Sequence, residues 1–429
     1  MRVLMHSLDA QPGVGARPTL GGGYAWVVWG LAVIFVVYLF GFQTGYAVVN
    51  PSIQKEVGLS VAQVGTIATI YTWAFAVCQL FSGALLDRLG ARAVIVPAIA
   101  LVTIGIFLFA NAFDYQTFIA AQIVLAIGAC AGFVGAGYVG GQWFGMAKFS
   151  FMFGLVQFAA SLFSAFGQNL IGLALGYFDW RDLFNLVGAF GVVLFAAGAL
   201  FIRNPAPVEG PGLSGGITSF LGDVLGAILE VAKIPHVWLS AVWGAMVFGV
   251  MLSCGVLWAP KILAARGMTA ELATFSASIM WMGLAAGCLI VPKSSDILKN
   301  RKLPISAGIA LQFASLACLV YLPPVGDAPT LMLCFLFGMG AAAHMLAFST
   351  AADVIPVRLI GTSAAIVNGL MFLVSGVLIA MPGEIVTKQI GAGSEVSMSL
   401  VEQAANPLVV ALVIALILSA VVRETYPRP

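Results

Sequence analysis

The sequence contains very little charge. Asp, Glu, Lys and Arg make up 8% of its 429 residues, whereas a soluble domain carries about 25%. No basic run occurs, so a nucleic-acid partner is not expected. Twelve stretches of at least 20 residues contain none of these four residue types, which excludes an ordinary soluble domain. They are 18–54, 57–86, 93–113, 115–147, 149–178, 183–202, 234–260, 272–292, 303–326, 328–352, 359–383 and 403–422.

Motifs for metal and nucleotide binding are also missing. The six cysteines all fall inside uncharged stretches, and no CxxC or His–Cys cluster occurs. A disulfide framework and a structural metal site are therefore not expected. No GxxxxGK[ST] loop is present, so we expect no cofactor, and an ion or substrate gradient would supply the energy. No uncharged stretch carries a nucleophile–base pair or a carboxylate pair, so we do not expect an enzyme.

The sequence is rich in long apolar stretches. Hydrophobic residues make up 61% of the sequence, and the mean hydropathy is +1.05. About 20 apolar residues suffice for a helix to cross a bilayer, and a backbone in lipid must satisfy its own hydrogen bonds. We therefore predict an all-α membrane protein of twelve transmembrane helices, with six on each side of the polar segment 203–233.

This division predicts five regions along the chain. Within the central linker, apolar residues recur at helical spacing over Ile217–Lys233, which indicates an amphipathic helix on the membrane surface. The regions are a disordered cytoplasmic N-terminus (1–22), an N-terminal six-helix bundle (23–203), a cytoplasmic linker (204–235), a C-terminal six-helix bundle (236–422) and a cytoplasmic tail (423–429).

Positive charge predicts the orientation in the membrane. If the N-terminus is cytoplasmic, 19 Lys and Arg residues divide very unequally, and only Lys55, Arg181, Lys261, Arg266 and Lys388 fall on the far side. Cytoplasmic loops carry the excess of Lys and Arg, so we expect both termini in the cytoplasm. An even number of spans also requires the two termini to share a side.

A short motif follows the second span of each half. Both copies place an Asp five residues before an Arg, at the expected cytoplasmic end of the span. A parallel repeat of six spans is a secondary-transporter architecture. The first copy contains Gly83, Asp87, Arg88, Gly90 and Arg92, and the second contains Asp296 and Arg301.

The first copy, G-x-x-x-D-R-x-G-x-R, resembles the loop 2–3 signature of the major facilitator superfamily, and the second resembles its degenerate echo. The resemblance extends over residues 24–422 and includes the segment Phe178–Arg181 at the start of the sixth span. It implies two pseudo-symmetric six-helix bundles that work by alternating access.

The resemblance also implies a gating role for the motif. Asp87 would sit against the N-terminus of a helix in the other half, where the helix dipole favours a carboxylate. Arg88 and Arg92 would form accompanying ion pairs and close the cytoplasmic gate in the outward-open state. The alternative is a positive-inside anchor without a dynamic role. Pro292 and Lys299 replace the two glycines in the second copy, so a latch there is less expected.

Polar residues inside apolar spans mark either a cavity or hydrogen bonds between helices. Superfamily members line a central cavity with spans 1, 4, 7 and 10, helped by 2, 5, 8 and 11, so polar and Trp residues of these spans are candidates. Within 149–178, four polar residues fall on one helical face. The candidates are Gln43, Tyr46, Gln122, Tyr138, Gln157, Ser161, Ser164, Gln168, Trp243, Trp281, His344 and Asn368.

His344 is the only ionisable His, Asp, Glu, Lys or Arg well inside an expected span, and such a group is a functional candidate. Three interpretations stay open. It could carry a coupling proton, because His titrates near neutral pH. It could donate a hydrogen bond to an organic anion, or it could be structural. Lys261, Lys293 and Glu384 lie near span ends, where long side chains reach the interface.

The absence of charged residues at mid-membrane also argues against several classes of substrate. Organic-phosphate exchangers of the superfamily carry cations at mid-membrane in spans 1 and 7, and none is present here. No mid-membrane Asp or Glu occurs, which argues against carboxylate-based sugar symport, and 149–178 lacks the G-x-x-x-G-P of drug antiporters. The pattern, with Trp143–Phe149 before the fifth span, resembles bacterial carboxylate-type members. We therefore expect a small organic anion such as a monocarboxylate.

Two other substrate classes and one other function remain open. A neutral polar solute would suit the amide and hydroxyl side chains. A metal ion or chelate such as iron is suggested by His344 next to Met345 and by methionines in neighbouring spans, although Met more often fills core gaps. A non-transporting receptor would not need the intact motif at 83–92. We expect membrane lipid and a small molecule as partners, a monomeric transport unit, and the bacterial inner membrane as location.

Overall fold

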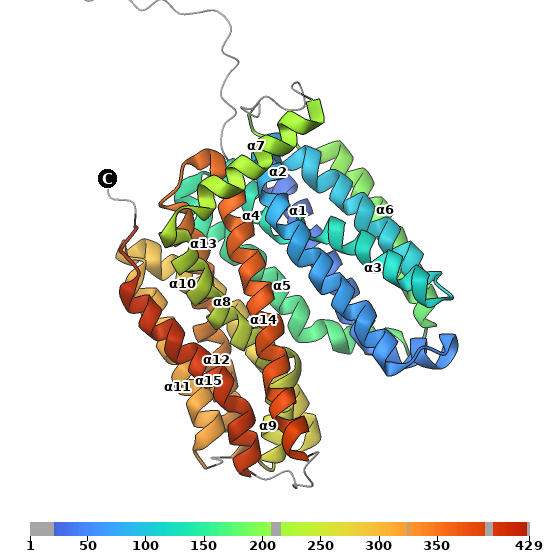
Figure 1. Cartoon of the computed structure of the whole chain (residues 1–429), viewed down its shortest axis with the longest axis vertical. Helices are drawn as coiled ribbons and strands as arrows, with labels where there is room; N and C mark the ends of the chain where they lie inside the picture. The colour runs from blue at the N-terminus through green and yellow to red at the C-terminus, as the bar shows by residue number, and fades with distance from the viewer. Residues whose placement is uncertain (1–20, 207–215, 324–325, 391–397, 427–429) are drawn as a thin grey trace, which may run out of the picture.

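The computed structural model describes residues 21–206, 216–323, 326–390 and 398–426, and every regular element in these ranges is helical (Figure 1). The prediction of a disordered N-terminus therefore falls almost wholly outside the described residues. The N-terminal half contains α1 (Gly23–Val57), α2 (Val61–Ala110), α3 (Tyr115–Ala129), α4 (Gly132–Phe144), η1 (Met146–Lys148), α5 (Phe149–Ala174) and α6 (Trp180–Phe201).

In the described part of the connection between the two halves, the chain forms the helix α7 (Gly216–Ala232). The C-terminal half then contains α8 (Pro235–Ser253), η2 (Cys254–Trp258), α9 (Ala259–Ala265), α10 (Ala270–Leu298), α11 (Lys302–Tyr321), α12 (Asp327–Ala341), η3 (Ala342–His344), α13 (Met345–Ala352), η4 (Val357–Leu359), α14 (Ile360–Ile390) and α15 (Met398–Val421).

The helix α2 supplies two spans rather than one. In the described residues, eleven helical segments are long and apolar enough to cross a membrane, and one of them, Gln63–Ala110, has 48 residues. At about 1.5 Å per residue such a helix is roughly twice as long as one crossing requires. The chain breaks at Gly90, whose φ of 78° and ψ of 169° lie outside the helical region, and glycine adopts such angles without steric cost. The twelve-helix, all-α membrane fold is thus confirmed.

Local capping sets where the helices of the first half begin. Ser60 and Gln63 form a reciprocal capping box at the start of α2. The carboxylate of Asp114 accepts the amide of Thr117 at the start of α3, and that of Asp179 accepts the amide of Arg181 at the start of α6. Each cap satisfies a backbone donor that a helix leaves free at its first turn.

Three spans are interrupted near their middle. The fourth breaks between α3 and α4, the seventh contains the π-helical turn η2, and the tenth contains the 3-10 turn η3. Such turns in membrane helices are tolerated where protein or a cavity satisfies the freed backbone groups. Here the carbonyl of Gly255 in η2 accepts the indole N–H of Trp281 at 3.0 Å.

The helix α7 lies across one end of the molecule, which we call the linker end (Figure 1). The two halves meet near α7 and diverge towards their other ends. Phe220, Val224 and Val231 are buried, whereas Leu221 and Leu225 of the same expected apolar stripe are exposed. The helix predicted over Ile217–Lys233 therefore packs one apolar side on protein and keeps another outside.

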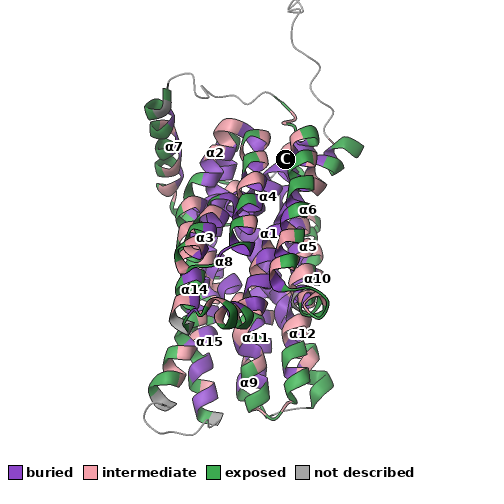
Figure 2. Cartoon of the chain, turned by 90° about the vertical axis from the view of Figure 1, so that its right-hand side faces the viewer, coloured by how far each residue is buried: buried purple, intermediate pink, exposed green. Residues whose placement is uncertain are grey.

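Large apolar side chains occur both in the buried core and on the outer surface. Figure 2 shows buried residues inside the bundle and exposed residues on the outer helices and at the ends. Large apolar side chains such as Phe190, Val193 and Ile417 are exposed on the outer helices, as a lipid environment requires.

Candidate functional site

The carboxylate of Asp87 joins the two halves at the linker end. It accepts hydrogen bonds from the amide of Gly361 at 2.8 Å, the amide of Thr362 at 2.7 Å and the hydroxyl of Thr362 at 2.7 Å. Gly361 and Thr362 are the second and third residues of α14, so Asp87 satisfies free donors at the positive end of that helix. We call this contact the Asp87 latch.

Two glycines allow the helices at the latch to touch backbone to backbone. A Cβ on Gly83 would lie 1.9 Å from the carbonyl oxygen of Gly361, and one on Gly361 would lie 2.8 Å from Oδ1 of Asp87. Real Cβ atoms essentially never come within 3.0 Å of a heavy atom in a residue packed against them. The latch therefore requires glycine at both positions.

The two arginines of the motif have different partners. Nη1 of Arg88 lies 3.3 Å from Oδ2 of Asp223 on α7. Arg92 instead donates to the carbonyl oxygens of Ala199 at 2.9 Å and Ile202 at 3.0 Å, at the end of α6. Arg88 thus forms an ion pair with the linker helix, whereas the described partners of Arg92 are backbone carbonyls and the side chain of Asn204.

The second copy of the motif stays within its own half. The guanidinium of Arg301 lies 3.1 Å from Asp296 and 3.2 Å from Asp353, and burial raises the pKa of the Asp353 carboxyl. The Glu424 carboxylate accepts the backbone amides of Arg301 and Lys302. Among the described contacts, this cluster ties the chain end to the C-terminal half and has no partner across the interface.

Behind the latch, further contacts seal the linker end between the halves. The hydroxyls of Ser150 on α5 and Ser349 on α13 lie 2.5 Å apart. The rings of Phe153 and Phe348 stack with centroids 4.8 Å apart. The amide of Asn368 on α14 donates to Gln79 on α2 at 3.0 Å. Together these contacts join the N-terminal and C-terminal halves beyond the latch.

Away from the linker end the halves enclose open space. A cavity of about 700 Å³ lies between α1 and α5 on one side and η2 and α10 on the other, and a cavity of about 440 Å³ adjoins it beside α2 and α14. Phe40, Leu252 and Val256 line both. The polar residues of the larger cavity are Thr44, Ser164, Asn169, Glu271, Thr274, Ser278 and Trp281, and those of the smaller are Gln43, Tyr71, Thr72 and Ser375.

A third, much smaller void lies at the sealed side of these cavities. It measures about 10 Å³, which is room for about one water molecule. Its polar side chains are Gln157 on α5, His344 in η3 and Asn368 on α14, so both halves contribute. Phe40, Phe133 and Phe372 line both this void and the 440 Å³ cavity, so the void adjoins that cavity across these side chains.

Comparison with known proteins agrees with this two-half architecture. Residues 23–380 match the model of the Major Facilitator Superfamily. The chain belongs to the major facilitator superfamily. It is 24% identical over 377 residues to a probable galactarate/D-glucarate transporter (GudP) of Bacillus subtilis, covering 78% of this chain and 81% of that protein. It is 23% identical over 319 residues to a probable L-galactonate transporter of Escherichia coli, covering 69% of this chain and 68% of that protein.

A third relative widens the range of named substrates. The chain is 22% identical over 307 residues to a probable sulfoacetate transporter (SauU) of Cupriavidus necator, covering 69% of this chain and 71% of that protein. The curated relatives are named as transporters, so this superfamily member is an integral membrane transporter rather than an enzyme.

The three spaces between the halves are lined by half of the candidates proposed from sequence. Gln43, Ser164 and Trp281 line the two larger cavities, and Gln157, His344 and Asn368 line the inner void. The side chain of Gln168 lies outside the described residues.

The remaining candidates lie in helix packing. The hydroxyl of Tyr46 donates to the carbonyl of Val64 at 2.9 Å, and Ser161 accepts the amide of Gln157 at 3.2 Å. Gln122 and Trp243 are fully buried, and their side-chain N and O atoms have no hydrogen-bond partner among the described residues. Tyr138 is buried on α4, near the charge of Asp87. These five residues line none of the three spaces described above.

Several cavity residues escaped the sequence prediction. Glu271, Thr274, Ser278 and Trp281 recur at intervals of three and four along α10, which places them on one helical face. That spacing was a usable signal, but only Trp281 was selected. Gln79, which bonds Asn368 across the interface, is one of two Gln residues in 57–86 and is not among the candidates proposed from sequence.

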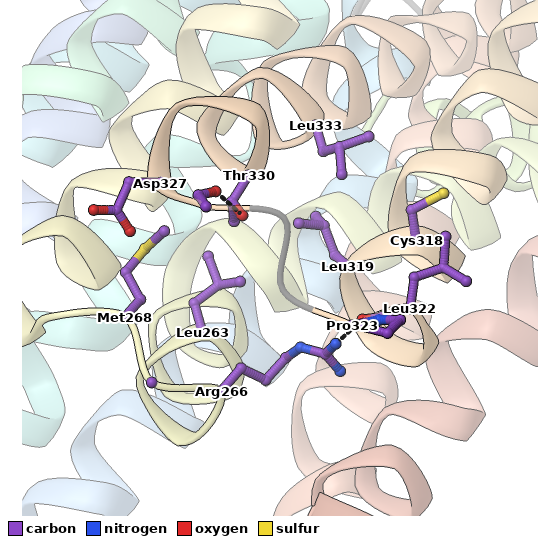
Figure 3. Close-up of a pocket in the computed structure, with 12 residues that line it drawn as sticks. Leu263, Arg266, Met268, Cys318, Leu319, Leu322, Pro323, Asp327, Thr330 and Leu333 are labelled. Carbon is purple, nitrogen blue, oxygen red and sulfur yellow. Dashed lines mark hydrogen bonds between the residues drawn. The ribbon is translucent and has the colours of Figure 1, made fainter.

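A fourth pocket lies apart from this pathway (Figure 3). It has a volume of about 240 Å³ and lies within the C-terminal half, between the ends of α9, α11 and α12. Its cation, Arg266, donates to the carbonyl oxygens of Val320 and Leu322. Because that guanidinium already caps the end of α11, the pocket is not the best candidate for the transported solute.

The other two candidate cations also lie outside the cavities. Lys261 is exposed and follows Pro260, which lines the 700 Å³ cavity, and its Nζ lies 4.8 Å from the centroid of the Trp258 ring. Lys293 is exposed near the linker end of α10, next to Pro292, which packs against Gly154. Of the two, only Lys261 is next in sequence to a residue that lines the cavity.

Proposed function

We propose that this superfamily member is a secondary active transporter that moves a small organic acid by alternating access. The observation that carries the proposal is the pairing of a sealed linker end with about 700 Å³ of open cavity between the halves at the other end. A cavity of this size suits a small molecule. The named substrates of the relatives, which include galactarate, L-galactonate and sulfoacetate, support an acid.

The excess of Lys and Arg on the linker side supports a cytoplasmic linker end. With that orientation the cavity opens to the outside of the cell, and the Asp87 latch holds the cytoplasmic gate closed. Opening the gate requires breaking three hydrogen bonds to a carboxylate, each of about 1.5–3 kcal/mol. The second motif, with Asp296 and Arg301, would keep its half rigid while the halves rock.

The cavity lining supports a solute rich in hydroxyl groups. Gln43, Thr44 and Ser164 face the space from the N-terminal half, and Ser278 faces it from the C-terminal half. Amides and hydroxyls both donate and accept hydrogen bonds, as a polyhydroxy acid does. Such contacts from both halves would let a bound solute draw the halves together.

A flux assay tests this proposal. Purified protein in proteoliposomes should accumulate radiolabelled D-galactonate or lactate, and excess unlabelled acid should compete, whereas galactose should not. Asp87→Asn serves as a variant with an altered gate, and protein-free liposomes give the background. Absence of uptake for every acid, with a folded protein, would contradict the proposal.

A neutral polar solute is the second candidate, because the described cavity lining contains one charged residue, Glu271. Uptake of galactose but not of any acid would favour it. A metal or chelate carrier gains no comparable support. No group of three or more His, Cys, Asp or Glu residues suited to a metal occurs in the described chain, and Met280 and Met345 are packed in the core.

A further inference from the structure

The side chains around the inner void determine which ionic form of an acid can bind there. Its polar lining consists of Gln157, His344 and Asn368, and the rest is apolar. The helices α8, α10, α11, α12 and α13 pack against η3. Their described charged and histidine side chains lie towards the helix ends: His236 on α8, Glu271, Lys293 and Asp296 on α10, Lys302 on α11 and Asp327 on α12, whereas α13 has none. A bare carboxylate entering this void would therefore lose its water without gaining a counter-ion, which is costly.

The hydrogen bond of His344 fixes what its ring offers to a ligand. Nδ1 lies 2.7 Å from the carbonyl oxygen of Ala341. A carbonyl only accepts, so Nδ1 carries the proton, and in the neutral ring Nε2 is then an acceptor. The ring is 1% exposed and lies against Phe248, with centroids 4.8 Å apart. No hydrogen bond to Nε2 occurs among the described residues.

A carboxylate has only acceptor atoms, so its lone pairs would face the lone pair of Nε2. A protonated carboxyl group has an O–H that Nε2 can accept. Its carbonyl oxygen can accept in turn from an amide, because Gln157 donates one N–H to Ser161 and Asn368 donates one to Gln79, and each amide nitrogen carries two. The three polar side chains thus match a neutral acid group better than an anion.

We propose that the transporter binds its substrate as a monobasic acid in the neutral, protonated form, with the O–H donated to Nε2 of His344. This inference rests on the proposed function. The proton joins the carboxylate from water on the side to which the cavity is open, and it leaves with the acid on the other side. If the proton moves to Nε2 in the bound state, the resulting ion pair has the same net charge. One proton and one acid cross together, and no net charge moves.

The inference also predicts selectivity. A dibasic acid such as galactarate would bring a second carboxylate into a cavity whose described lining offers Glu271 and no cation. The void of about 10 Å³ has room for about one water molecule, so an acid group would enter it only when Phe40 and Phe372, which line both spaces, move aside. A monobasic acid is therefore the preferred class.

The decisive measurement is the steady accumulation of D-galactonate in proteoliposomes at a clamped membrane potential. For a neutral acid, accumulation should be the same at zero and at 100 mV inside-negative, whereas a bare anion would be depleted about 50-fold at 100 mV. One pH unit of gradient, acid outside, should raise accumulation about tenfold. Accumulation that falls with potential would overturn the inference and leave the proposed function standing. No uptake of any acid would overturn the proposed function.

Two variants locate the proton acceptor. His344→Leu should raise KM for D-galactonate at least tenfold, because the acceptor is lost. His344→Gln should retain electroneutral uptake, because its amide oxygen accepts the same O–H. His236→Gln, at the linker end of α8, is the matched control, and thermal unfolding verifies that each variant folds. An unchanged KM in His344→Leu, or equal transport of galactarate and D-galactonate, would overturn the inference.

Discussion

Glu230 on α7 forms a two-bond ion pair with Arg358 of the C-terminal half, with N–O distances of 2.5 and 3.1 Å. Two turns earlier on the same helix, Asp223 pairs with Arg88 of the N-terminal half. The linker helix is therefore bonded to both halves at once, directly over the closed end. Any motion that parts the halves at this end must stretch one of these two pairs.

Removing one pair should loosen the closed end only slightly. The side chains of Arg358 and Glu230 are 60% and 45% exposed, and exposed pairs contribute about 0–1 kcal/mol. Glu230→Gln should thus shift the balance between closed and open linker ends by at most about fivefold. The distance between spin labels at the exposed positions 148 and 293 reports the shift. A wholly open population would show that α7 contributes far more than an exposed ion pair.

Neutralising the latch should have a larger effect. In Asp87→Asn the carboxylate that receives three hydrogen bonds is replaced by an amide. Each bond to a charged group contributes about 1.5–3 kcal/mol. The ratio of open to closed linker ends, measured by the same spin-label distance, should therefore rise at least tenfold. Asp223→Asn is the matched control, since it removes a more exposed charge near the same end. Equal shifts in the two variants would argue against a special role for Asp87.

A single added methyl group should prevent closure. In Gly83→Ala the new Cβ would lie 1.9 Å from the carbonyl oxygen of Gly361, a backbone atom that cannot rotate away. We expect the variant to fold and to populate the open linker end almost exclusively, with uptake reduced at least tenfold. Gly65→Ala on the same helix, where nothing lies within 4 Å of the added atom, should behave as wild type. Normal transport by Gly83→Ala would show that the halves never approach this closely during the cycle.

The opposite end of the N-terminal half should respond to pH. The Glu56 carboxylate accepts the indole N–H of Trp180 at 2.6 Å and Nε of Arg181 at 2.7 Å, and the bond to Arg181 is the main cause of a lowered Glu56 pKa. A lowered pKa means that the contact stabilises the fold above the ordinary Glu pKa of about 4.3. That contribution is lost as the pH falls through the folded value.

Glu56→Gln should therefore lower the melting temperature at pH 7, by an amount equivalent to about 1 kcal/mol or less because the pair is partly exposed. The difference from wild type should vanish in strongly acidic buffer, where the wild-type carboxyl is also neutral. Glu384→Gln, at an exposed position of α14, gives the background. A difference that persists at low pH would assign the effect to packing rather than charge.

The lengths of the apolar stretches predicted the spans well. A backbone in lipid must satisfy its own hydrogen bonds, and for stretches of this length a helix does so. The same criterion could not reveal how α2 runs through Gly90, or that η2 forms a π turn, because these features depend on a glycine angle and on a carbonyl that Trp281 satisfies. Neither the break at Gly90 nor the π turn changes the hydrophobicity of the sequence, which was the basis of the prediction.

The cavity was predicted less completely than the spans. Gln157, Ser161 and Ser164 share a helical face, yet Gln157 bonds Ser161 while Ser164 lines the 700 Å³ cavity. Sequence spacing defines the face of one helix, but which part of that face meets a neighbour depends on the crossing of α5 with α1 and α10. The same holds for Asn368, whose partner Gln79 is supplied by the other half.

The Asp87 latch and the two ion pairs of α7 both hold the linker end closed, but they respond differently to dissolved salt. The pairs of α7 are partly exposed, and attraction between exposed charges is screened within about 8 Å at physiological ionic strength. Asp87 instead binds backbone amides at a helix start shielded by protein. Dilute buffer should therefore tighten the linker helix while leaving the latch unchanged. The ionic strength of the surrounding solution thus helps set how readily this transporter opens.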